Sequence, residues 1–176
     1  MSHIHDYSYL IRRIRIALSI VVIGLIGSGL TTFPLLWETE LLNAWFGKAT
    51  IFYDYLPAVS GFISHLHEGV IYTEQFYPFL FYGLDWLGFA HIAIALCFIG
   101  PLRDPVRNQW VIEWGILICL LAVPAIFYFG ISHNMPFFWN FIDGIFPLLA
   151  LIPLTIAWYL TKELTINDGC KVKGKE

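Results

Sequence analysis

A few ionisable side chains lie inside strongly apolar stretches of the sequence, where a charged group is costly and is often functional. Asp85 and Asp143 are carboxylates of this kind, and His91 is an imidazole. Such groups can offer polar contacts or exchange protons when they are shielded from water. We therefore predict a site for a hydrophobic small molecule, such as a quinone or a lipid.

The two carboxylates are predicted to lie at a similar depth. Asp85 is about eight residues into its apolar stretch and Asp143 about seven into its own, so both lie roughly 10–12 Å along a helix. His133 falls in the short connection beside them, and His67 falls on a segment that could cover them. The predicted site, which opens toward the outer face of the membrane and supplies ligand contacts or a proton relay, comprises Asp85, His91, Asp143, His133 and His67.

A proline adds a second polar group next to Asp143. Pro147 has no N–H, so the backbone carbonyl of Asp143 loses its helical donor. Interrupted helices in membranes often expose such carbonyls at binding sites. The alternative is that Pro147 only kinks the helix for packing, and the sequence leaves both open.

The composition indicates an integral membrane protein. Of the 176 residues, 58% are apolar and 13% are charged, against about 25% charged in ordinary soluble domains. A net charge of -3 with no dense basic patch argues against a nucleic-acid partner. Four stretches reach the ~20 apolar residues of a transmembrane helix. They are residues 14–36, 77–102, 109–130 and 137–160.

These stretches predict an all-α fold, because lipid leaves a spanning backbone no outside hydrogen-bond partner. We expect the four helices to form a bundle within one domain over residues 1–162, followed by a tail at 163–176. Of the ten basic residues, only Lys48 lies on the side away from the termini. The positive-inside rule then places both termini in the cytoplasm, in what we expect to be a bacterial inner membrane.

We predict a structural role for three charged residues near the cytoplasmic ends of the second and third spans. Arg103 and Arg107 precede the third span, and Glu113 lies near its start. We predict that the arginines anchor at the lipid headgroups and that Glu113 takes part in ion pairing with them.

The outer segment, residues 37–76, is predicted to contain an amphipathic surface helix over 56–70. Its apolar stripe repeats at spacings of three and four. The polar face carries His65 and Glu68, with His67 at the flank. His65 and His67 point ~200° apart on a helix, so they do not favour a metal site. The stripe consists of Leu56, Val59, Ile63, Leu66 and Val70.

Other functions stay open. A b-type haem would need two axial ligands at similar depth, and only His91 lies deep in a span, so haem b is disfavoured. Nucleotide-binding and nucleophile motifs are absent from the sequence. The remaining alternative is a structural or accessory subunit whose polar residues only fix helix register. The sequence leaves undecided whether the protein is an enzyme, and whether it assembles with other membrane subunits or with itself.

The haem alternative has a direct spectroscopic test. We expect protein expressed with haem supplied and purified in detergent to show no Soret absorption band, because a facing partner for His91 is not predicted. A Soret band that His91→Ala removes would contradict this expectation.

Overall fold

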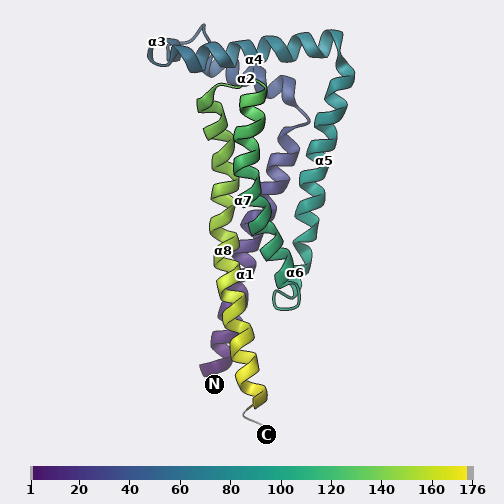
Figure 1. The fold of residues 1–176 in the computed structure, drawn as a ribbon, viewed down its shortest axis with the longest axis vertical. Coiled ribbons are helices and arrows are strands. Elements are labelled where there is room, and N and C mark those ends of the chain that lie inside the picture. The colour runs from purple at the N-terminus through teal and green to yellow at the C-terminus, as the bar shows by residue number, and fades with distance from the viewer. Residues whose placement is uncertain (1, 174–176) are drawn as a thin grey trace. The chain divides into compact units, whose positions relative to one another are not determined.

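The computed structural model describes the backbone of residues 2–173 and the side chains of residues 7–166. Helices are the only regular elements in this part of the chain (Figure 1). The predicted all-α fold is therefore confirmed. The elements are α1 (Ser2–Thr31), α2 (Leu35–Phe46), α3 (Phe52–Tyr55), α4 (Pro57–Phe76), η1 (Pro78–Leu80), α5 (Phe81–Cys97), α6 (Ile99–Arg103), α7 (Gln109–Ser132) and α8 (Phe137–Lys173).

Four helical stretches are long and apolar enough to cross a membrane, as predicted: Tyr7–Thr31, Pro78–Arg103, Gln109–Ser132 and Phe137–Ile166. The first ends earlier than residue 36, because residues 32–34 form a turn and Pro34 caps the start of α2. A proline disfavours helix in the residue before it, which explains the break. The fourth continues as helix through Pro147 and Pro153 to Lys173, well into the segment predicted as a tail.

The chain forms two compact units, and each is described by itself. One unit comprises Met1–Leu25 with Ile94–Glu176, and the other comprises Ile26–Ala93. Both α1 and α5 contribute residues to each unit. The arrangement of all four spans as one bundle stays a prediction.

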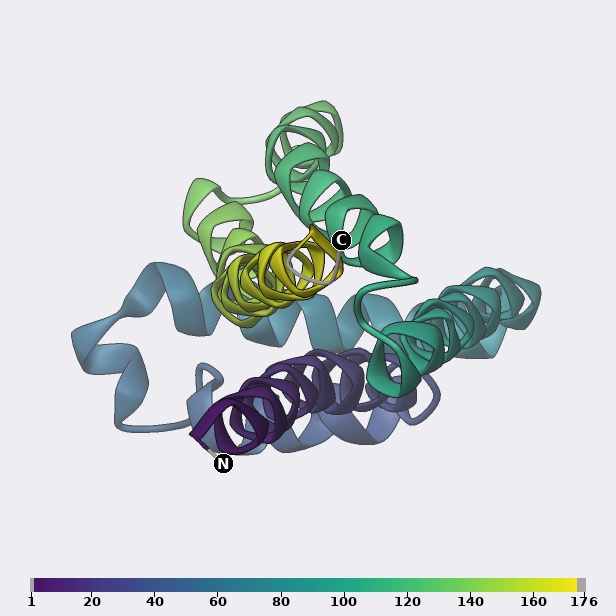
Figure 2. The same cartoon turned by 90° about the horizontal axis from the view of Figure 1, so that it is seen from below.

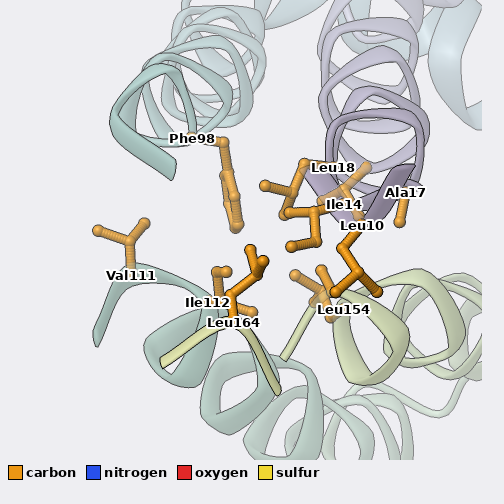
Figure 3. Close-up of a cluster of buried hydrophobic side chains, with 11 residues drawn as sticks. Leu10, Ile14, Ala17, Leu18, Phe98, Val111, Ile112, Leu154 and Leu164 are labelled. Carbon is orange, nitrogen blue, oxygen red and sulfur yellow. The ribbon is translucent and has the colours of Figure 1, made fainter. Parts of the chain in front are cut away.

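The core of the first unit lies between α1, α7 and α8. Figures 1 and 2 show α7 and α8 side by side. Buried side chains from α1 meet Phe98 and the inward faces of α7 and α8 (Figure 3). A Cβ on Gly115 would come within 2.8 Å of the Phe98 ring, so this glycine lets the ring pack against α7. The labelled core residues are Leu10, Ile14, Ala17, Leu18, Phe98, Val111, Ile112, Leu154 and Leu164.

A hydrogen-bonded corner connects α6 to α7. The carboxylate of Asp104 accepts a hydrogen bond from the backbone N–H of Arg107 at 3.0 Å. The side-chain amide of Asn108 donates to the carbonyls of Gly100 and Asp104, at 3.2 and 2.9 Å. These bonds satisfy backbone groups that the turn would leave unpaired. They also fix the start of α7 at Gln109, where the sequence placed it.

In the second unit, α2 and α4 are joined by a polar contact. The Ser64 hydroxyl on α4 donates to the Asn43 carboxamide oxygen at 2.7 Å and accepts from the Lys48 backbone N–H at 3.0 Å. The predicted helix over 56–70 is present as the longer α4, which begins after the exposed Leu56. The buried residues of α4 are Ser60, Ile63, Ser64 and Val70, so the predicted amphipathic character of this helix is not confirmed. Its location on the membrane surface stays a prediction.

The end of α1 and the middle of α5 approach closely in the second unit. A Cβ on Gly29 would lie 2.7 Å from the carbonyl oxygen of Gly88. A Cβ on Gly88 would meet the Thr32 hydroxyl and would lie 2.8 Å from the Gly29 carbonyl oxygen. Small residues that allow backbones to approach are a common basis of helix association in membranes.

This contact gives a stability prediction. Gly88→Ala should lower the free energy of unfolding by about 1–3 kcal/mol, because the new methyl group overlaps with α1. Thermal unfolding in detergent, followed by circular dichroism, measures the effect. Gly83→Ala is the matched control on α5, since a Cβ there meets nothing within 4 Å; it should leave stability unchanged or raise it by up to about 1 kcal/mol. Equal melting temperatures for the two variants would contradict the close approach.

Candidate functional site

The predicted site residues fall in both units. Asp85, His91 and His67 belong to the unit Ile26–Ala93. Asp143 and His133 belong to the unit that contains α7 and α8. The structure therefore divides the predicted residues into two groups by unit, and the single site that would unite them stays a prediction.

The first group contains two histidines with defined hydrogen bonds. On α5, His91 Nδ1 lies 2.9 Å from the Leu87 carbonyl oxygen. A carbonyl oxygen can only accept, so Nδ1–H is the donor in this bond, and the bond orients the ring. His67 Nδ1 lies 3.3 Å from the Thr39 hydroxyl, which itself donates to the backbone of α2. The ring of His67 therefore acts as donor and ties α4 to α2.

Asp85 lies on an exposed face of α5. Three aromatic side chains share this face, at positions that coincide within ~60° around the helix. They contact one another, with ring centroids 6.1 Å apart for Tyr82 and Trp86 and 5.5 Å apart for Trp86 and Phe89. Their exposed fractions are 65%, 54% and 56% for Tyr82, Trp86 and Phe89. This face joins a carboxylate to an apolar, uncovered surface.

The second group centres on a buried carboxamide that the sequence analysis missed. Asn140 on α8 is only 2% exposed, and its Nδ2 has no hydrogen-bond partner. The carboxamide packs against Gly130 of α7, where a Cβ would overlap with it. A buried donor of this kind normally finds a partner, so an unpaired one requires an explanation.

Asn140 shares one face of α8 with Asp143. Helical geometry places Asp143, Pro147, Asn140 and Gly144 in this order within ~100° around the helix. Asp143 is half-buried and Gly144 is buried, yet a Cβ on Gly144 would meet nothing within 4 Å. Open space therefore lies beside Gly144, one helical turn along α8 from Asn140.

Aromatic rings border the same face. Phe137 and Phe141 of α8 follow Gly144 around the helix and contact each other, with centroids 4.9 Å apart. Phe127 of α7 lies 5.9 Å from Phe137 and 5.4 Å from Phe141, centroid to centroid. The face thus runs from a carboxyl group through a carboxamide and open space to an aromatic cluster.

His133 lies at the end of α7, just before this face begins. Its backbone N–H donates to the Phe129 carbonyl at 3.0 Å, and its side chain is exposed. The next residue, Asn134, has a φ of 56°, a left-handed conformation that asparagine tolerates better than most residues. It reverses the chain between α7 and α8.

Glu113 lies at the opposite end of the α7–α8 pair. Its carboxylate accepts hydrogen bonds from Gln109 Nε2 at 2.7 Å and from Trp158 Nε1 at 3.0 Å. The ammonium group of Lys162 lies 3.7 Å from the centroid of the Trp158 ring. These contacts join α7 to α8. Ion pairing of Glu113 with the exposed Arg103 and Arg107 stays a prediction.

The part of the chain with described side chains brings together no group of three or more His, Cys, Asp or Glu that could hold a metal ion. Comparison with protein-family models, with curated proteins and with solved structures finds no match for the chain. The functional argument therefore rests on the groups above.

Sequence signals for Asn140 did exist. A carboxamide within an apolar span is costly in hydrocarbon, as a carboxylate is. Asn140 also precedes Asp143 by three residues, the spacing of side chains that share a helix face. A search for all intramembrane polar residues, and not only the ionisable ones, would have identified it.

One carboxyl group outside the spans gives a pH prediction. Burial at the start of α2 raises the pKa of Glu38 above its ordinary value of 4.5. The folded chain therefore holds this proton more tightly than the unfolded chain does. The resulting stability is present below the unfolded pKa and is lost as the pH rises through the folded pKa.

Raising the pH from below 4.5 toward neutrality should therefore lower the Tm of the wild type relative to that of Glu38→Gln. Thermal unfolding of both proteins in the same detergent across this range measures the difference. Glu40→Gln removes an equal charge from an exposed neighbour and is the control. A constant Tm difference between Glu38→Gln and the wild type would contradict the effect of burial.

Proposed function

We propose that this integral membrane protein binds an uncharged hydrophobic molecule that carries a carbonyl group, such as a quinone or a lipid ester. The binding face is the part of α8 that carries Asn140, Asp143, Gly144 and Pro147. The observation that carries the proposal is the buried Asn140 amide, which has a hydrogen to donate and no acceptor.

The energetics favour a carbonyl as the missing partner. A buried donor without an acceptor costs about 1–3 kcal/mol. If the carboxamide turned from Gly130 toward Gly144, a ligand carbonyl there would remove that penalty, while the rest of the molecule would stay in an apolar setting. Phe137 and Phe141 would contact a flat ring or an acyl chain at the edge of the same face.

Asp143 and His133 complete the proposed site. The carboxyl group of Asp143 would make a second polar contact or exchange a proton with the ligand, as would the exposed His133 at the end of α7. The positive-inside rule predicts that both termini lie in the cytoplasm, and the turn between α7 and α8 would then lie at the outer face. The site would then open toward the outer leaflet of a bacterial inner membrane.

Asp85, His91 and His67 are not required by the α8 face. We keep them as candidate ligand or proton-relay residues of the other unit. Substitution of Asp85 in the binding assay below decides whether that group shares the ligand.

A second candidate function, accessory subunit of a membrane complex, is favoured by the α5 face. A carboxylate about 10 Å inside a span is costly against lipid. The exposed Asp85, with Tyr82, Trp86 and Phe89 around it, would be covered by a neighbouring helix that offers a hydrogen-bond donor. This function is compatible with a ligand on α8.

Asn140→Leu separates ligand binding from packing. The apolar side chain removes an unsatisfied donor with little change of size, so the Tm should stay equal or rise. Affinity for a short-chain benzoquinone should fall by about 2- to 12-fold, the loss expected for one neutral hydrogen bond. Titration followed by tryptophan fluorescence, with extraction and mass spectrometry of co-purified quinones and lipids, measures binding.

Thr155→Val is the matched control, because it removes a polar group of α8 that is bonded to its own helix at Leu151. It should leave the affinity unchanged. A Tm that falls on Asn140→Leu with unchanged affinity would mean that the carboxamide serves packing alone. Equal affinity losses for Asp85→Asn and Asp143→Asn would mean that both units contribute to the ligand site.

A further inference from the structure

A groove of about 660 Å³ runs along α1, within the unit that holds Met1–Leu25. It lies near the N-terminal end of the span Tyr7–Thr31. The residues that line it all come from α1, and none of them is acidic. Those that matter here are Arg12, Arg15, Ser19, Ile16, Ile20 and Ile23.

The polar lining forms a narrow stripe. Arg12, Arg15 and Ser19 are spaced by three and four residues, so they coincide within ~60° around α1. The isoleucines continue beside the stripe and deeper along the helix. From Arg15 to Ile23 the helix rises about 12 Å. The groove is therefore cationic at one end and apolar along the rest.

The two guanidinium groups are available to an anion. Arg15 Nε donates to the Leu102 carbonyl at 3.0 Å, which holds the side chain in place and leaves its terminal nitrogens as donors. Arg12 is exposed. Arginine forms paired, charge-assisted hydrogen bonds to phosphate oxygens, which a single point charge does not.

The exposed isoleucines favour a lipid over a soluble anion as the ligand of this groove. Ile16, Ile20 and Ile23 are 53%, 58% and 69% exposed, and they lie toward the middle of the span. A phosphate held by the arginines would leave its acyl chain along these side chains. We propose that the α1 groove binds one anionic phospholipid of the leaflet that contains the N-terminal end of α1. This site is independent of the proposed ligand face on α8.

The test uses the full chain and counts retained lipid. The protein is reconstituted in nanodiscs that contain phosphatidylglycerol and phosphatidylcholine with the same acyl chains, released, and analysed by native mass spectrometry. We expect the wild type to retain phosphatidylglycerol in preference. Arg12→Gln with Arg15→Gln should reduce this preference by about tenfold. Both lipids carry a phosphate, but the choline ammonium cancels its charge in phosphatidylcholine, so the arginines favour phosphatidylglycerol.

Arg13→Gln is the matched control. Arg13 is not part of the groove, and its guanidinium lies over the Tyr9 ring, 5.6 Å from the centroid. It removes the same charge one residue from Arg12, and the preference should stay within about twofold of the wild type. Arg12→Gln alone replaces the double variant if that variant does not fold. It keeps the bond from Arg15 to Leu102 and should still weaken the retention of phosphatidylglycerol.

The outcomes separate the alternatives. Equal retention of the two lipids by the wild type would overturn the proposal. So would an equal effect of Arg13→Gln, since net charge alone would then explain the preference. Displacement of the lipid by glycerol 3-phosphate would assign the arginines to a soluble phosphate, and would also overturn it. Asn140→Leu should keep the wild-type lipid preference whatever its quinone affinity, and loss of the preference in this variant would contradict a separate site on α1.

Discussion

Polar groups in the hydrocarbon core of a membrane have no water to form hydrogen bonds with. They must find partners within the protein, and the described structure depends on this constraint. Where the chain can satisfy them internally, it does so locally. Thr161 is fully buried, yet its hydroxyl donates to the Ala157 carbonyl of its own helix at 2.7 Å. Glu113 accepts from two donors on α7 and α8. Most buried polar groups of the chain have hydrogen-bond partners within the chain. A buried polar group without a partner is therefore a candidate for a functional role.

Close backbone approach is the second means of holding these helices together. Association in a membrane depends on van der Waals packing, since lipid is as apolar as the side chains. Gly29 meets Gly88 at the end of one unit, and Gly115 admits the ring of Phe98 in the other. Asn140 packs against Gly130 by the same principle. The glycine that lets α7 and α8 approach also encloses the carboxamide that lacks a partner.

The sequence predicted the features that depend on local hydrophobic periodicity and on the free-energy cost of burying polar groups in a membrane. Four spans, a helix after Leu56 and a third apolar stretch from residue 109 follow from apolar runs, and the structure has them. The end of the first span was misplaced because hydropathy continues across Pro34 while the helix does not. Asn140 could have been named from its place in an apolar span, but its burial against Gly130 is a long-range contact that periodicity does not reveal. The shared Asp85–Asp143 site remains untested for the same reason, since it needs two helices to be placed together.

Three intramembrane side chains show why the α8 face is the strongest functional candidate. Glu113 has donors within hydrogen-bond distance, so its charge is accounted for by structure. Asp85 is exposed, so a neighbouring helix would satisfy it as well as a ligand would. Asn140 differs from both, because it is buried and still lacks an acceptor. A neighbouring helix has little access to a 2% exposed amide. A small molecule in the open space beside Gly144 would lie one helical turn away and would reach the amide if the carboxamide turned from Gly130 toward it.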